Sequence, residues 1–258
     1  MSAISIRNLD KYYGALHVLR SLDLSIGGGE GVVLLGANGC GKSTLMKCLN
    51  GLEKPQSGRI FIHEQEVTAA KGRHLRAIRR DVGMVFQQFN VVENLTVFQN
   101  VLYGAMGRQT GGLLAVWNAL ASRETREKAM HCLARVRMTD KAGYRCRDLS
   151  GGQQQRVAIA RMLMQSPKVI LADEPVASLD PKAGKEVMDL LWDVVREHNM
   201  TVFCSLHQLD LARHYADRIV GMKAGRIVLD SSRTPVDQAE LAGLYQGETR
   251  VDAGGHAQ

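Results

Sequence analysis

The residues best suited to chemistry lie in a glycine-rich run that fits the pattern GxxxxGK[ST] and contains Lys42 and Ser43. In such a loop, successive backbone N–H groups turn toward phosphate oxygens at a helix N-terminus, where aligned peptide dipoles favour an anion. We expect the Lys42 ammonium to reach the β- and γ-phosphate oxygens of a nucleotide, and the Ser43 hydroxyl to ligate Mg²⁺. The residues of this predicted phosphate loop are Gly36, Ala37, Asn38, Gly39, Cys40, Gly41, Lys42, Ser43 and Thr44.

Two carboxylates, Asp173 and Glu174, follow an apolar run that begins at Val169. The carboxyl end of a buried strand lies at the edge of an α/β sheet where ligands bind. We therefore expect Asp173 to hold Mg²⁺, directly or through water, and Glu174 to polarise an attacking water as general base. Taken alone, two acids after a strand more often form a solvated turn. The functional interpretation depends on the phosphate loop elsewhere in the chain.

The elements that must position these residues alternate between strands and helices, as in an α/β fold with an antiparallel start. The 258 residues suit one large α/β domain or a core with a small appendage. Predicted strands cover 3–26 (antiparallel), 31–35, 58–67, 82–86, 169–172, 201–205, 218–222 and 226–229. Predicted helices cover 42–50, 94–138, 154–165, 183–198 and 208–215, with an apolar insertion at 113–120 that contains Trp117.

Composition excludes several classes of protein. A hydrophobic content of 45% with 23% charged residues is that of a globular chain, neither disordered nor collagenous. No window has the 18 apolar residues of a membrane span and the N-terminus lacks a secretory signal, which predicts a cytoplasmic protein. The five cysteines are odd in number and form no CxxC pair, so we expect reduced thiols. The net charge is +7, but the basic residues form no dense run, which indicates a solvated surface.

A third motif, Leu149-Ser150-Gly151-Gly152-Gln153, lies 21 residues before Asp173 and precedes a predicted helix. This sequence resembles the signature of ATP-binding cassette (ABC) ATPases. Ser150 and the backbone N–H groups of Gly151 and Gly152 offer donors to a γ-phosphate at a helix start. The resemblance implies that they serve the nucleotide of the other subunit, in a head-to-tail homodimer that encloses two ATP molecules. From these residues alone, a Ser/Gly helix cap without a ligand remains the alternative.

Four further residues match this family's pattern. Tyr13 matches the aromatic residue that stacks on adenine, and Gln87 the glutamine that touches Mg²⁺ and the attacking water. Asp180 matches the loop that crosses the dimer interface, and His207 the switch histidine that contacts the γ-phosphate. Without the resemblance, we would interpret Tyr13 as an edge-strand aromatic and Gln87 as a surface loop residue. Asp180 would be a helix N-cap and His207 an ordinary polar residue.

The resemblance covers residues 4–230 and implies a P-loop α/β core with an antiparallel β subdomain and a helical subdomain near 88–160. We expect one ABC ATPase domain at 1–248 and a frayed tail at 249–258. An apolar segment after Gln87 (Phe89, Val91, Val92, Leu95 and Val97) matches the place where the family receives a permease helix. Core packing explains part of this apolar stripe equally well.

The subtype is suggested by weaker signals. The segments 171–181, 205–211 and 215–222 and the Trp117 insertion are similar to the ATP-binding subunits of bacterial phosphonate importers. The first alternative is the ATPase subunit of a polar amino acid importer, because these proteins share the Phe-Gln-Gln-Phe-Asn run at 86–90. The second alternative is an ABC ATPase that acts on nucleic acid. The likeness implies a peripheral subunit on the cytoplasmic side of the inner membrane, with permease subunits, an extracytoplasmic binding protein and no nucleic acid as partners.

Cys40 departs from the family, which more often has serine at that position of the phosphate loop. The nearby helix N-terminus and the Lys42 ammonium favour thiolate over thiol. We therefore expect Cys40 to react with a maleimide ahead of the other cysteines, with protection by Mg-ATP. A thiol too enclosed by the loop to react is the alternative.

Overall fold

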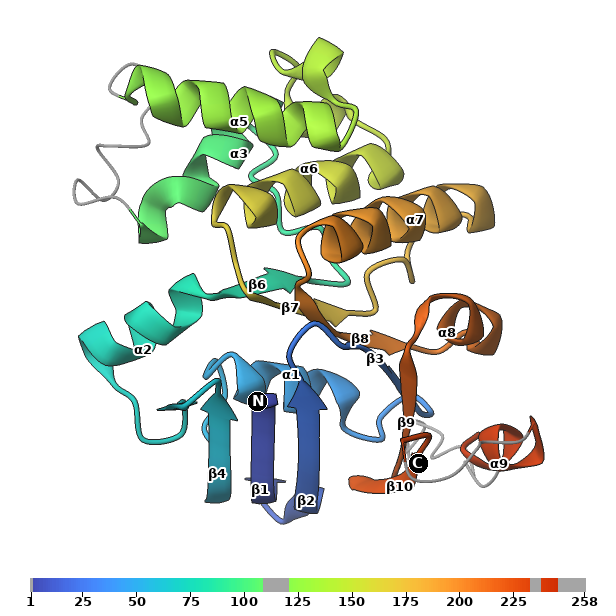
Figure 1. Ribbon diagram of the computed structural model, residues 1–258. Coiled ribbons are helices and arrows are strands. Elements are labelled where there is room, and N and C mark those ends of the chain that lie inside the picture. Colours follow the sequence, from blue (N-terminus) through green and yellow to red (C-terminus); the bar gives the residue numbers. More distant parts are fainter. Residues whose placement is uncertain (1, 109–120, 233–237, 246–258) are drawn as a thin grey trace, which may run out of the picture.

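The computed structural model describes residues 2–108, 121–232 and 238–245, which build two sheets and the helices around them (Figure 1). The central sheet has six strands in the order β10-β9-β3-β8-β7-β6. Strands β6, β7, β8, β3 and β9 run parallel, and β10 pairs antiparallel with β9. Their bounds are β3 Gly31–Leu35, β6 Val82–Val85, β7 Val169–Asp173, β8 Thr201–Leu206, β9 Arg218–Lys223 and β10 Arg226–Asp230.

The central strands are apolar because both faces of the sheet are covered. Val33 and Leu35 of β3 pack into a core beneath the helices, whereas Val32 and Leu34 pack into a second core on the other face. Strands β7 and β8 alternate in the same way, as the period of two in a strand requires. Polar groups are therefore confined to the ends of these strands.

The second sheet is antiparallel and lies below the central sheet in Figure 1, with α1 between the two layers. Its order is β2-β1-β4-β5, with bounds β1 Ser2–Tyr13, β2 Leu16–Gly27, β4 Ser57–Ile62 and β5 Gln65–Glu66. Helix α1 (Lys42–Leu49) contributes Leu45, Met46 and Leu49 to the shared core. This packing fixes the phosphate loop, which connects β3 to α1.

Helices cover the opposite face, above the sheet in Figure 1. There α3, α5 and α6 pack on one another, and α7 lies beside α6. The helices are α2 Gly72–Arg80, α3 Val97–Leu102, α5 Arg123–Arg135, α6 Gly151–Met164, α7 Pro181–Glu197, α8 Leu209–Tyr215 and α9 Gln238–Gly243, with short 3₁₀ turns η1 Tyr103–Gly107, η2 Thr139–Lys141 and η3 Cys146–Asp148. The predicted fold class, an α/β P-loop core with an antiparallel β subdomain and a helical subdomain, is confirmed.

Side-chain caps explain where the observed helices begin. Ser122 accepts a hydrogen bond from the Thr125 N–H at the start of α5. Helix α7 begins at Pro181, two residues before the predicted start, because Asp180 caps it and proline suits the first helical position. Helix α6 begins at Gly151 rather than residue 154, because Ser150 is its cap.

Other expectations were wrong or lie outside the described residues. The basic stretch after residue 70 forms α2, and α9 follows the last strand; neither helix was predicted. The predicted helical span 94–138 is broken into α3, η1 and α5 among the residues described. The insertion at 113–120 with Trp117 and the tail at 249–258 both lie outside the described residues.

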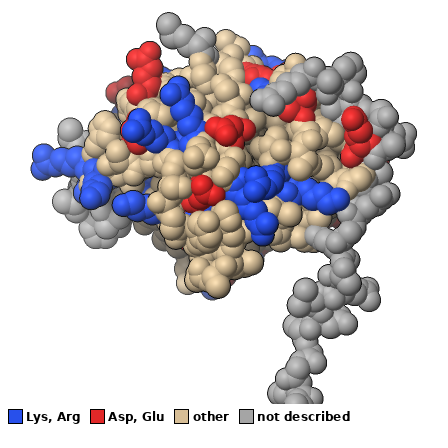
Figure 2. Space-filling model, turned by 90° about the horizontal axis from the view of Figure 1, so that it is seen from below, with Lys and Arg blue, Asp and Glu red and all other residues tan. Residues whose placement is uncertain are grey.

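The surface is charged in both signs. Seen from below, Lys and Arg are interspersed with Asp and Glu (Figure 2), in agreement with a solvated surface rather than one continuous basic face on this side. In the described part of the chain, no helix combines the length and the apolar character needed to cross a membrane.

A buried ion pair joins the last two strands of the central sheet. The Arg218 guanidinium donates to both Asp230 carboxylate oxygens, Nε to Oδ1 and Nη2 to Oδ2, each at 2.7 Å. The Arg218 hydrogen bonds lower the Asp230 pKa from 3.8 to about 2. A lowered pKa means that the ionised form stabilises the fold above pH 4 and that this stabilisation disappears as pH falls through the folded-state pKa.

Asp230→Asn is predicted to lower the free energy of unfolding by about 2 kcal/mol at pH 7, the equivalent of the pKa difference. The deficit relative to the parent protein should shrink between pH 4 and pH 2. Urea unfolding at a series of pH values measures it. A deficit that stays constant across that interval would contradict the role of the Asp230 charge.

Candidate functional site

Several strands of the central sheet end at one edge around a hollow of about 750 Å³. The phosphate loop follows β3, Gln87 follows β6, Glu174 follows β7 and His207 follows β8. Parallel strands present their carboxyl ends together, so segments far apart in sequence meet here. The hollow is lined by Val18, Gly36, Ala37, Asn38, Gly39, Gly41, Lys42, Ser43, Thr44, Gln87, Glu174, Ala177, His207 and Tyr245.

Lys42 lines the hollow and is buried, with 4% of its side chain exposed. Its ammonium donates to the carbonyl oxygens of Gly36 at 2.7 Å and Ala37 at 3.2 Å. It also lies 3.3 Å from the Glu174 Oε1 atom. The buried ammonium is thus compensated by loop carbonyls and one carboxylate, as a buried charge requires. This places the predicted phosphate ligand and the predicted general base side by side.

Asp173 is held by two hydroxyl groups from different elements. Its Oδ1 atom accepts hydrogen bonds from the Ser43 Oγ at 3.1 Å and from the Ser205 Oγ at 2.8 Å. Asp173 is 7% exposed, and Ser205 is fully buried. Hydrogen bonds to an ionised carboxylate are stronger than those between neutral groups. The contact ties β7 both to β8 and to the start of α1.

Glu174 has a backbone φ of +45°, in the left-handed region that a residue with a side chain rarely adopts. Such a backbone costs of order 1 kcal/mol or more and persists only where its surroundings hold it. Here the Glu174 N–H donates to the Ser205 hydroxyl at 3.0 Å and to the Ser205 carbonyl at 3.2 Å. The turn directs the carboxylate into the hollow, with Oε2 at 3.8 Å from the His207 Nδ1.

The oxygen ligands suit Mg²⁺. Ser43 and Asp173 are in contact, and Mg²⁺ is usually held by one or two carboxylates together with substrate phosphates. Gln87 is exposed and lines the same hollow. Among the residues with described positions, no group of three or more His, Cys, Asp or Glu side chains is arranged to hold a metal ion by itself. The donor set therefore fits a cation that a nucleotide helps to bind.

Tyr13, the predicted adenine-stacking residue, lies beside the phosphate loop rather than in the lining of the hollow. Its phenol forms a hydrogen bond with the Thr44 side chain, and burial of the phenol raises its pKa. The Lys11 ammonium lies 4.7 Å from the ring centroid. The ring is 43% exposed, so it is accessible to a planar base.

The signature residues Ser150–Gln153 do not line the hollow in the described part of the chain. They begin α6, where the Gln153 N–H donates to the Ser150 Oγ at 3.4 Å and the Gln153 Oε1 accepts from the Ser150 N–H at 3.1 Å. This is a capping box. The Ser150 hydroxyl accepts within this cap, so its own proton remains available to an acceptor. The cap and the predicted phosphate contact are therefore compatible.

Asp180 is exposed and caps α7, with its Oδ1 accepting from the Lys182 N–H at 3.1 Å and the Ala183 N–H at 3.0 Å. The alternative interpretation as an N-cap therefore describes its contacts within one chain. Gly151 approaches the side chains of Phe89 and Leu179, so the signature packs against the segments that follow Gln87 and precede Asp180.

The predicted apolar docking segment is only partly a surface. Val97 is completely buried in the helical core, so its inclusion was wrong: it is the first residue of α3 and faces inward. Val92, by contrast, is 45% exposed. Its backbone is fixed by the buried Asn100, whose amide accepts from the Val92 N–H at 2.8 Å and donates to the Val92 carbonyl at 3.0 Å. Phe89, Val91 and Leu95 are half-buried, so Val92 is the apolar side chain that this loop exposes after Gln87.

All five cysteines are buried, and none of them forms a disulfide in the described part of the chain. Cys40 is 8% exposed, and its thiol lies against Gly36, where an added Cβ would approach the Sγ to 2.8 Å. The enclosure favours the alternative of a poorly accessible thiol over a reactive one. The reactivity itself remains a prediction.

Several residues of the site had not been predicted: Ser205, Val18, Ala177 and Tyr245. Ser205 had a partial signal in the sequence, because it is a polar residue at the end of an apolar predicted strand, but its pairing with Asp173 is visible only in the structure. Tyr245 had none, because it lies 38 residues beyond His207 in a segment without a motif.

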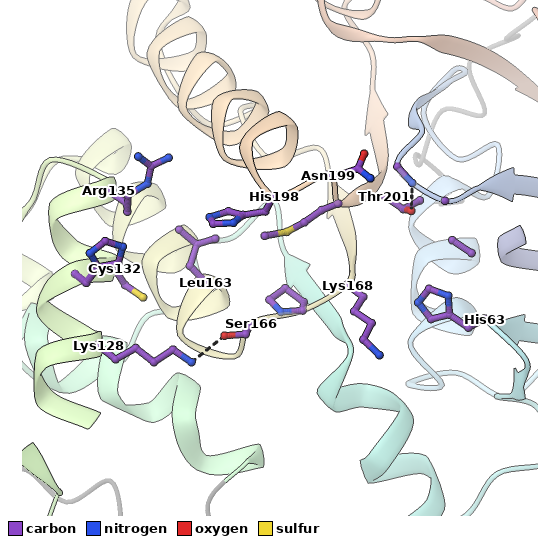
Figure 3. A pocket seen from close by; sticks show the side chains of 16 residues that line it. His63, Lys128, Cys132, Arg135, Leu163, Ser166, Lys168, His198, Asn199 and Thr201 are labelled. Atoms are coloured by element: carbon purple, nitrogen blue, oxygen red, sulfur yellow. Dashed lines mark hydrogen bonds between the residues drawn. The ribbon is translucent and has the colours of Figure 1, made fainter. Parts of the chain in front are cut away.

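A second hollow of about 750 Å³ lies at the opposite edge of the sheet (Figure 3). Lys168 and Asn199 line it near the amino ends of β7 and β8, and α5 forms the other wall, where Lys128 donates to Ser166 at 2.8 Å. Ligands of parallel sheets bind at the carboxyl edge, and none of the predicted site residues lines this hollow in the described structure. The first hollow is therefore the candidate nucleotide site.

Comparisons with known proteins agree with this geometry. The family described as ABC transporter matches residues 19–177. The chain is 42% identical over 251 residues to the phosphonates import ATP-binding protein PhnC 2 of Oceanobacillus iheyensis, covering 97% of this chain and 98% of that protein. It is 47% identical to the phosphate-import ATP-binding protein PhnC of Mycolicibacterium smegmatis, covering 93% and 90%.

Among solved structures, the dimeric ATP-binding cassette MJ0796 bound to ADP and Pi is similar, with a TM-score of 0.78 and 34% identity. The match covers 88% of this chain and 97% of that one.

Ser205→Ala is predicted to lower the free energy of unfolding by about 1.5–3 kcal/mol, because a buried carboxylate loses a hydrogen bond. Ser57→Ala is the matched control, since Ser57 also donates to an aspartate, Asp10, at 2.9 Å but on the surface. The control should change stability by about 0.5 kcal/mol or less. Urea unfolding of both variants measures the two changes in the free energy of unfolding. Equal losses of stability would contradict the special position of Ser205.

Proposed function

The chain belongs to the ABC transporter family, and on that premise we propose that it is the ATP-hydrolysing subunit of a bacterial importer for phosphonate or a related phosphorus oxyanion. As a member of this family it binds and hydrolyses ATP to drive transport. The observation that carries the assignment of roles is the contact of Lys42, Glu174 and His207 around one hollow at the carboxyl ends of the strands.

Each residue of the hollow has a chemical role in the proposal. The Lys42 ammonium and the loop N–H groups bind the β- and γ-phosphates, where positive charge stabilises the transferring phosphoryl group. Mg²⁺, when bound by Ser43, Asp173 and Gln87 together with phosphate oxygens, supplies further charge neutralisation. Glu174 accepts a proton from the water that attacks the γ-phosphorus, and ADP leaves. His207 donates to the γ-phosphate and orients Glu174.

Glu174 is well placed as the base. Its carboxylate lies between Lys42 and His207, and its backbone is held by Ser205. Because the ammonium and the carboxylate are already paired in the hollow, phosphate oxygens that bind Lys42 compete with Glu174 for it. Release from this ion pair leaves the carboxylate available to the attacking water.

The second half of each site is proposed to come from a partner copy. Ser150, Gly151, Gly152 and Gln153 begin a helix outside the hollow, and their N–H groups suit a γ-phosphate presented by another chain. A head-to-tail homodimer would place two ATP molecules between phosphate loop and signature, with the Asp180 loops at the interface. The similar cassette MJ0796 is described as dimeric in a state bound to ADP and Pi, which supports a dimer for this chain.

The membrane partner is proposed to dock on the exposed loop at Val92, beside Gln87 and packed through Phe89 against the signature. A permease bound there would contact the segment that carries Gln87, so a movement of Gln87 on nucleotide binding would reach the permease. This arrangement makes the chain a peripheral subunit at the cytoplasmic face of the inner membrane. The binding protein that delivers substrate lies on the other side. The polar amino acid importer suggested by the 86–90 run has no independent support in the site geometry.

Glu174→Gln is predicted to keep ATP binding and to reduce hydrolysis by ~10² to 10⁴, the usual loss when a general base is removed. Lys42→Ala should instead weaken nucleotide binding. Steady-state hydrolysis and equilibrium nucleotide binding separate the two effects. Glu186→Gln, which alters an exposed glutamate paired with Arg156, is the matched control and should hydrolyse ATP normally. Retained turnover by Glu174→Gln would refute its role.

The same Glu174→Gln protein is expected to dimerise with Mg-ATP, because it binds ATP without consuming it. Sedimentation in saturating Mg-ATP measures the state. Adding Ser150→Arg to the same chain should abolish the dimer by blocking the signature side of each site. A strictly monomeric Glu174→Gln species under these conditions would exclude the proposed sandwich.

Deletion of the gene is predicted to abolish growth on a phosphonate as sole phosphorus source. Complementation with Val92→Asp should fail to restore growth although the purified protein keeps its ATPase activity, since burying a charge at an apolar interface is unfavourable. Val228→Asp, a change at another exposed valine (55%), should restore growth. Intact phosphonate use with impaired amino acid uptake would instead favour the amino acid importer, and an unfolded Val92→Asp protein would favour a core role.

A further inference from the structure

Tyr245 enters the nucleotide hollow from the far end of the described chain. It follows α9 and lines the hollow together with the phosphate loop, Glu174 and His207. The nucleotide motifs account for the other polar residues of the lining, but no motif includes this tyrosine. Its position therefore needs a separate physical explanation.

The segment that carries Tyr245 is anchored on the central sheet. Leu241 and Leu244 are buried, at 1% and 3% exposure, in the helical core. Leu244 packs on Gly221 of β9, where an added Cβ would approach the Leu244 side chain to 2.8 Å. The Lys223 ammonium also donates to the Gly243 carbonyl at 2.9 Å. The glycine at 221 thus makes room for the leucine next to Tyr245.

The Tyr245 hydroxyl connects two loops of the site. It donates to the His207 carbonyl at 3.2 Å, and the backbone of Gly36 at the start of the phosphate loop also hydrogen-bonds to the phenol oxygen. Burial, and the nearby Cys40 and Glu174 side chains, raise the pKa of the phenol, so it carries its proton at neutral pH. The Tyr245 hydroxyl can therefore donate a hydrogen bond at neutral pH.

We propose that Tyr245 is a positioning residue that fixes the His207 main chain against the phosphate loop, so that the imidazole meets the γ-phosphate and Glu174 in a productive geometry. The His207 side chain is 42% exposed and lies 3.8 Å from Glu174, beyond a hydrogen bond, so its own contacts with that residue do not fix it. The carbonyl contact restrains the backbone from which that side chain projects. This proposal rests on the proposed ATPase function.

The test removes only the hydroxyl. Tyr245→Phe is expected to lower kcat for ATP hydrolysis about 2- to 10-fold, the rate equivalent of one neutral hydrogen bond, with KM for ATP changed less than about twofold. Thermal unfolding should be nearly unchanged, because Leu241 and Leu244 keep the anchor. Tyr144→Phe, at an exposed tyrosine outside the hollow, is the matched control and should leave kcat and KM unaltered.

A double-mutant cycle in single-turnover assays checks that Tyr245 acts through His207. In the His207→Ala background, Tyr245→Phe should reduce the rate no further, whereas an independent effect would multiply. Unchanged kcat in the single Tyr245→Phe variant overturns the proposal. So does a rise in KM alone, which indicates a nucleotide contact, or a fall in KM, which indicates a tyrosine that blocks the hollow. A parent protein without ATPase activity would instead refute the proposed function itself.

Discussion

The geometry of the candidate nucleotide site depends on the two hydrogen bonds that the Asp173 carboxylate accepts. This carboxylate is buried at the end of β7 and accepts hydrogen bonds from Ser43 at the start of α1 and from Ser205 in β8. A buried carboxylate must be satisfied by such donors, so the three elements cannot shift independently. The same Ser205 hydroxyl accepts from the Glu174 N–H and stabilises its left-handed backbone. The hydrogen bond between Asp173 and Ser205 thereby fixes the positions of the proposed Mg²⁺ ligand, Asp173, and of the proposed base, Glu174.

Charge compensation in the hollow follows from the same burial. Lys42 is enclosed and is satisfied by two loop carbonyls and by Glu174, which also faces His207. These are the groups that a triphosphate, a cation and a water would engage. The protein therefore presents an arrangement in which polar partners are exchanged rather than created when nucleotide binds, which limits the reorganisation needed for catalysis.

The signature shows how one feature can serve two purposes. Ser150 and Gln153 close a capping box that starts α6, which is a requirement of the helix in a single chain. The same helix start lies outside the lining of its own chain's hollow. Packing of Gly151 against Phe89 and Leu179 links this helix to the loop after Gln87 and to the segment before Asp180. These segments are therefore in direct contact within one chain.

The sequence by itself predicted the chemistry of the phosphate loop and the two carboxylates, and it predicted most strands and helices, although not α2 or α9. These signals are local: glycine spacing, apolar runs and caps act within a few residues. Strand β3 was predicted with its observed bounds. The starts of α6 and α7 were missed by two or three residues, because a cap at Ser150 or Asp180 outweighs the apolar pattern.

Only the tertiary structure decided which distant residues complete the site. Ser205 acquires its role from parallel pairing with Asp173, and Val97 is directed into the core by the helices around it. Tyr245 reaches the hollow because Leu244 packs against Gly221, a contact between segments that no local pattern connects. Contacts of this kind depend on which surfaces pack together, and packing is a property of the whole fold rather than of any one segment.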